Sequence, residues 1–93
     1  MVLYKFYKND CPSCYAISRL LMRAEIPSDV EIIQKNVELS ENKDFAKNNN
    51  INKVPVLMFE NGNKLEGHIP MSQLLEFLNT KGVKNAISNE RKI

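Results

Sequence analysis

The sequence predicts an α/β domain in which helices cover both faces of one four-stranded mixed sheet. Short runs of aliphatic and aromatic residues alternate with segments whose apolar residues recur at helical spacing, in the order β-α-β-α-β-β-α. A strand, a helix and a second strand in succession form a right-handed unit with parallel strands. The pair Asn61–Gly62 is a strong hairpin signal between the last two strands. Parallel and antiparallel pairing are therefore expected in the same sheet, packed between helices.

The first half of the chain supplies the strand–helix–strand unit. Residues 2–7 (VLYKFY) are mostly apolar and are followed by turn-forming residues, which favours a strand. A helix is expected over 12–25, ended by the segment 26–29 (IPSD), and a second strand over 30–39. The apolar residues that recur at helical spacing in this segment are Tyr15, Ile17, Leu20, Leu21, Met22 and Ala24.

The second half of the chain supplies a short helix, a hairpin and a last helix. Ser40 is a helix-start signal, and residues 44–48 suit a short helix. Residues 54–59 and 64–67 flank the hairpin turn as strands. Pro70 opens an amphipathic helix that ends near Gly82. The apolar residues expected to face inward from this helix are Leu74, Leu75, Phe77 and Leu78.

Length and composition indicate one soluble domain. The chain has 93 residues, 43% hydrophobic and 26% charged, which we divide into a domain over 1–82 and a basic tail over 83–93. A net charge of +2 gives no reason to expect nucleic acid or a membrane as partner. The N-terminus lacks the apolar run of a signal peptide, so we expect a cytoplasmic location. We also expect a monomer. Cytosolic thiols are kept reduced, which disfavours a structural disulfide.

The only two cysteines, Cys11 and Cys14, lie in the motif CPSC. Such a pair is able to hold a metal, close a structural disulfide or carry electrons. Cys11 is expected at the N-cap of the first helix, with Pro12 at the first helical position. The positive helix end then favours a Cys11 thiolate. Cys14 lies about one turn further on, where it is able to attack a mixed disulfide at Cys11.

Neighbouring residues adjust the reactivity of Cys11. Ser13 offers a hydroxyl hydrogen bond, and Lys8 adds positive charge three residues before the cysteine. Asp10 opposes them, because a nearby carboxylate raises the pKa of a thiol. We therefore expect a lowered but not extreme pKa for Cys11.

A metal centre is the main alternative use of the two cysteines. A structural zinc site takes four Cys or His ligands. The only other such residue in the chain is His68, which we interpret as a solvated loop histidine. We therefore expect neither a metal nor an organic cofactor.

Three segments together resemble the thioredoxin/glutaredoxin superfamily: CPSC, INKVPVLMFENG and GHIPMSQLLEFL. The resemblance extends from Val2 to about Lys81 and implies the thioredoxin fold. It also implies a cis peptide bond between Val54 and Pro55, facing Cys11. The Val54 backbone would then pair with a substrate in strand fashion, and Gly67 would allow close approach of a substrate backbone. From the residues alone, Pro55 also suits the start of a strand and Gly67 a simple turn.

Some segments of the chain resemble glutaredoxins and others resemble thioredoxins. CPSC is similar to the glutaredoxin motif, whereas the middle of the chain and the segment from Gly67 to Leu78 are similar to thioredoxins. Asp10 stands where thioredoxins have a tryptophan. The buried aspartate of thioredoxins that assists proton transfer aligns with Lys5, so we expect either that water serves instead or that Lys5 turns outward.

The resemblance implies a cytoplasmic thiol–disulfide oxidoreductase that reduces protein disulfides, with ribonucleotide reductase as a typical client of the family. A flavoprotein of the thioredoxin-reductase type is favoured over glutathione as donor, because the segment after Gly67 lacks the second glycine and the acid of glutaredoxins. The alternatives are a glutathione-dependent glutaredoxin and a non-catalytic binding module acting as a redox or metal switch. The site residues expected are Cys11 as nucleophile, Cys14 as resolving cysteine, and Lys8, Pro12, Ser13, Val54, Pro55 and Gly67 for substrate binding.

Overall fold

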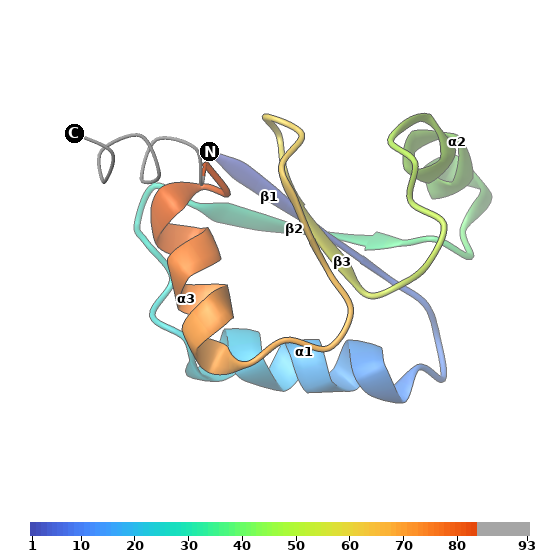
Figure 1. Ribbon diagram of the computed structural model, residues 1–93. Coiled ribbons are helices and arrows are strands. Elements are labelled where there is room, and N and C mark those ends of the chain that lie inside the picture. Colours follow the sequence, from blue (N-terminus) through green and yellow to red (C-terminus); the bar gives the residue numbers. More distant parts are fainter. Residues whose placement is uncertain (84–93) are drawn as a thin grey trace.

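The computed structural model describes residues 1–83 and shows the element order expected from the sequence (Figure 1). Of the predicted tail over 83–93, only Val83 belongs to the described residues. The elements are β1 (Val2–Tyr7), α1 (Pro12–Arg23), β2 (Glu31–Asn36), α2 (Ser40–Asn48), β3 (Val56–Phe59), β4 (Lys64–Glu66) and α3 (Met71–Thr80).

β1 lies inside the sheet, whose strand order over the described residues is β2-β1-β3-β4. It pairs in parallel with β2, from Val2 opposite Glu31 to Tyr7 opposite Asn36. On its other side it pairs antiparallel with β3, which in turn pairs antiparallel with β4. The mixed four-stranded sheet predicted from the sequence is therefore confirmed.

Helices cover both faces of this sheet, as expected: α1 and α3 lie on one side and α2 on the other (Figure 1). Successive strand residues point to opposite faces and therefore feed two cores. The core under α1 and α3 contains Leu3, Ile17, Leu21, Leu57, Phe59, Leu65, Ile69, Leu74, Phe77 and Leu78. The core under α2 contains Phe6, Ala46, Ile51, Val56 and Met58.

Two elements in the first half end earlier than the sequence predicted. α1 ends at Arg23 rather than at residue 25, because Ala24 is already extended, with φ −74° and ψ 147°. β2 ends at Asn36 rather than at residue 39. Its partner β1 ends at Tyr7, whose carbonyl accepts the Val37 amide at 2.8 Å. Beyond that bond no residue of β1 remains to pair with.

In the second half, β3 begins at Val56 rather than at residue 54, because Pro55 has no N–H to donate to a neighbouring strand. β4 ends at Glu66 rather than at residue 67, since Gly67 has a φ of +80° and leaves the extended conformation. α3 begins at Met71, with Pro70 as its N-cap, and ends at Thr80, where the left-handed Lys81 forms the C-cap.

Two of the apolar residues that recur at helical spacing in α1 face solvent. Met22 is 85% exposed and Tyr15 is 57% exposed. The residues that α1 buries are Cys14, Ile17 and Leu21. The inward stripe is therefore narrower than the list of apolar residues suggested. No helix within residues 1–83 is both long enough and apolar enough to cross a membrane.

α2 begins at Ser40, which confirms the helix-start signal there, and so includes four residues before the short helix predicted over 44–48. Asn42 stabilises this first turn. Its side chain is buried, and its Nδ2 donates to the Asn36 carbonyl at 2.9 Å. This bond ties the first turn of α2 to the end of β2, and the same carbonyl also accepts the Leu39 amide at 3.2 Å.

We predict that Asn42→Ala lowers the free energy of unfolding by about 1 kcal/mol, because it removes one of the two hydrogen bonds to the Asn36 carbonyl and leaves only that from the Leu39 amide. Urea denaturation would measure the change. Asn48→Ala is the matched control, since Asn48 ends the same helix and is exposed. Equal losses in the two variants would show that the bond to Asn36 contributes nothing.

Candidate active site

Cys11 caps the N-terminus of α1, as its sequence position predicted. Its backbone is extended, with φ −124° and ψ 99°, and its carbonyl accepts the Tyr15 amide at 3.1 Å. Its Sγ accepts the Cys14 amide at 3.2 Å and lies 3.5 Å from the Ser13 hydroxyl. Pro12 occupies the first helical position. The helix end therefore surrounds one sulfur atom with hydrogen-bond donors.

The two cysteines form a disulfide within this first helical turn, with their Cα atoms 5.2 Å apart. Both are buried in this oxidised form, Cys11 at 4% and Cys14 at 3% exposure. Exposure therefore does not distinguish the two cysteines in this form. What distinguishes them is the N-cap position, which gives Cys11 alone the Cys14 amide as a donor.

The Val54–Pro55 peptide bond is cis, as the resemblance implied. Gly67 lies beside it, and its amide donates to the Pro55 carbonyl at 3.3 Å. These residues and Ser13 line one pocket of about 390 Å³, together with Lys53, Glu66 and His68. The fold thus brings Ser13, Val54, Pro55 and Gly67 together next to the disulfide.

Lys8 lies on the other side of Val54. The two residues line a second pocket of about 410 Å³, together with Val37, Ile51, Asn52 and Lys53. Pro12, the remaining predicted substrate-binding residue, is exposed at the start of α1 and lines neither of these pockets. Lys53, which the sequence analysis did not single out, is shared by both.

Lys5 does not turn outward. It is 5% exposed, on the face of β1 that packs under α1. Its Nζ donates to Gln34 Oε1 at 3.1 Å and lies 4.9 Å from the centre of the Tyr7 ring. Burial removes water from the ammonium group and lowers the pKa of Lys5 from its ordinary value of 10.5. The position that aligns with the buried aspartate of thioredoxins is therefore occupied by a buried amine.

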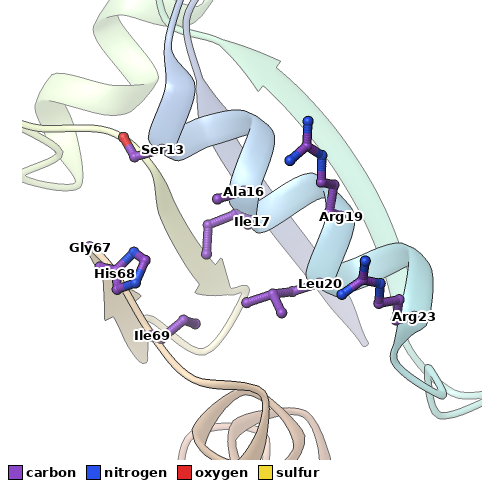
Figure 2. Close-up of a pocket in the computed structure, with 9 residues that line it drawn as sticks. All are labelled: Ser13, Ala16, Ile17, Arg19, Leu20, Arg23, Gly67, His68 and Ile69. Atoms are coloured by element: carbon purple, nitrogen blue, oxygen red, sulfur yellow. The ribbon is translucent and has the colours of Figure 1, made fainter.

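Sequence analysis missed a groove along α1 (Figure 2). Its volume is about 280 Å³, and it runs from Ser13 between α1 and the segment that joins β4 to α3. The signal was available, because Ser13, Ala16, Leu20 and Arg23 recur at the spacing of one helix face. His68, predicted to be solvated, is exposed and lines the opposite wall.

Within residues 1–83 there is no group of three or more His, Cys, Asp or Glu side chains placed to hold a metal ion.

The thioredoxin family model matches residues 1–80. This chain belongs to the thioredoxin family. It carries the family's paired cysteines at the start of α1 and the cis proline beside them. A search of curated proteins finds no match to the chain.

Solved structures support the assignment of the fold. A mutant thioredoxin from Halobacterium salinarum NRC-1 superposes with a TM-score of 0.70 at 22% identity, covering 85% of this chain and 72% of that one. Trxlp from Edwardsiella tarda EIB202 gives 0.69 at 25% identity, over 83% and 80% of the two chains. An uncharacterised thioredoxin-like protein from Clostridium perfringens gives 0.64 at 22% identity, over 89% and 71%.

We predict that Lys5→Met raises the free energy of unfolding at pH 7 by about 1 kcal/mol, because an apolar side chain of similar length avoids burying a charge. The unfolded chain holds the Lys5 proton more tightly than the folded chain. Wild-type stability should therefore rise as the pH increases from the lowered pKa towards 10.5, and the gap to the variant should narrow. Urea denaturation at several pH values measures this.

Lys43→Met is the control for this prediction, because Lys43 is exposed on α2. It should change neither the stability at pH 7 nor its slope with pH. A loss of stability in Lys5→Met would show that the contacts with Gln34 and Tyr7 outweigh the cost of burial.

Proposed function

We propose that this chain is a dithiol–disulfide oxidoreductase that reduces protein disulfides. The observation that carries the proposal is the disulfide at the start of α1, in which Cys11 is the N-cap and receives the Cys14 amide. In the reduced protein the same amide and the positive helix end favour a thiolate at Cys11. Within residues 1–83 no hydrogen bond to the Cys14 sulfur is formed, and Cys14 lies one turn further along α1.

The reaction is a pair of thiol–disulfide exchanges. The Cys11 thiolate attacks one sulfur of the substrate disulfide, and the other substrate sulfur leaves as a thiolate. The Cys14 thiolate then attacks the Cys11 sulfur, which releases the second substrate thiolate and closes the Cys11–Cys14 disulfide. Two electrons pass to the substrate, solvent protonates its thiolates, and an external reductant returns the pair to the dithiol.

The substrate would lie across the pocket formed by Ser13, Val54, Pro55 and Gly67. Among residues 1–83, no hydrogen bond to the Val54 backbone is formed, so its N–H and carbonyl are available to an extended substrate segment. No side chain is present at Gly67 to obstruct the approach. Cytoplasmic enzymes that oxidise a dithiol in each turnover, such as ribonucleotide reductase, are the proposed clients.

We predict that Cys11→Ser reduces the rate of insulin reduction to that of dithiothreitol alone, because the attacking sulfur is lost. Cys14→Ser should instead accumulate a mixed disulfide between Cys11 and the substrate, visible by mass spectrometry without reductant. Circular dichroism would establish that both variants are folded. Full activity in Cys11→Ser would contradict the mechanism and favour a non-catalytic binding module.

The proposed electron donor is a flavoprotein of the thioredoxin-reductase type. Binding of glutathione calls for an acceptor for its amine, as well as cations for its carboxylates. The first turn of α3 carries no acid, and its N-cap is Pro70, which forms no side-chain capping bond. Glutathione is the second candidate, because Lys8 and Lys53 line one pocket with Val54 and Glu66 lines the next.

We predict faster oxidation of NADPH with the thioredoxin reductase of the source organism than with glutathione and glutathione reductase. Both assays use the same disulfide substrate and the same concentration of this protein. Cys11→Ser serves as the blank in each. Turnover with glutathione alone would reverse the assignment and make the chain a glutaredoxin in function.

A further inference from the structure

The groove along α1 has an apolar floor and a cationic edge. Ile17 and Leu20 of α1 point towards Ile69 on the opposite wall, and Arg19 and Arg23 lie on the same helix (Figure 2). His68 adds a hydrogen-bonding group on the opposite wall. The groove therefore combines apolar contact with positive charge, a combination that suits a segment with both apolar and acidic side chains.

The two arginines are free to bind a ligand. Both are exposed, and within residues 1–83 neither lies within ion-pair distance of a carboxylate. They are four residues apart, so their side chains extend from neighbouring positions on one helix face. Glu66, the acid that precedes the opposite wall, lines the neighbouring pocket with Pro55 rather than this groove.

The groove is continuous with the proposed reaction site. Ser13, Gly67 and His68 line both the groove and the pocket that contains Pro55. From Ser13 to Arg23 the groove follows α1 over ten residues, which corresponds to about 15 Å of helix. An extended peptide covers that length with roughly four to five residues.

We propose that this groove binds an acidic segment of the disulfide substrate, with its carboxylates four to five residues away from the cysteine that Cys11 attacks. The inference rests on the proposed function and adds a substrate class to it. Aliphatic side chains of the segment contact Ile17, Leu20 and Ile69. The carboxylates at its far end meet Arg19 and Arg23, where a bidentate guanidinium contact is geometrically favoured.

The test uses three synthetic peptides that share one disulfide ring formed by two cysteines. Each peptide has a flanking segment on both sides of the ring. In these flanks the residues four and five positions from the nearest cysteine are glutamates in the first peptide, lysines in the second and serines in the third. Their reduction by the full chain, with dithiothreitol as donor, is followed by chromatography and gives kcat/KM. At low salt we expect the glutamate peptide to exceed the lysine peptide by about fivefold or more, from contacts with both arginines.

The double variant Arg19→Glu/Arg23→Glu should abolish or invert this preference while reducing the serine peptide as wild type does. Lys43→Glu/Lys47→Glu is the matched control, since it changes the net charge equally with the same spacing on α2, on the other face of the sheet. It should keep the preference. Raising the ionic strength from about 0.01 M to about 1 M shortens the Debye length from ~30 Å to ~3 Å and should remove the preference in wild type.

A fourth peptide places the glutamates directly beside the cysteines, where the groove predicts no preference over serine. Equal kcat/KM for the glutamate and lysine peptides, or the same loss of preference in both double variants, would overturn the groove assignment while leaving the proposed function intact. If wild type reduced none of the peptides faster than dithiothreitol alone, the proposed function and this inference would both be wrong.

Discussion

The position of β1 inside the sheet is the constraint on which the rest of the structure depends. β1 pairs with β2 on one side and with β3 on the other, so both halves of the fold are built on one six-residue strand. Leu3 and Phe6 are fully buried in opposite cores. β1 ends at Tyr7, and a short loop leads from there to Cys11 and α1. The pairing of β1 with strands on both sides therefore fixes the position of Cys11.

The candidate site is formed by three loop segments that lie next to the ends of strands. The loop after β1 supplies Cys11, the turn before β3 supplies Val54 and Pro55, and the turn after β4 supplies Gly67. The bond from the Gly67 amide to the Pro55 carbonyl joins two of these turns directly. Such turns leave backbone groups unpaired, and a rigid sheet keeps them in register with each other. This arrangement allows a 93-residue chain to present a defined groove beside the Cys11–Cys14 disulfide.

The face of the sheet under α1 contains a buried lysine, Lys5. A buried amine occupies the position where the resemblance to thioredoxins would place a carboxylate, and Gln34 and Tyr7 stabilise it. The groove along α1 is likewise a property of this chain's own side chains. Lys5 lies on β1 and the groove lies on α1, so both features are on the side of the sheet that α1 covers.

The sequence by itself determined which elements form, their order and the placement of the two cysteines at the start of a helix. The apolar periodicity, the Asn61–Gly62 turn and the CPSC motif each depend on residues that are close together in the sequence, so they can be predicted from the sequence alone. Tertiary structure decided the rest, because the deciding partners are far apart in the chain. β2 ends where β1 offers no further partner, and α2 begins where Asn42 reaches the Asn36 carbonyl. Lys5 is buried because α1 and β2 close over it, and Arg23 becomes part of a groove only when Ile69 forms the opposite wall.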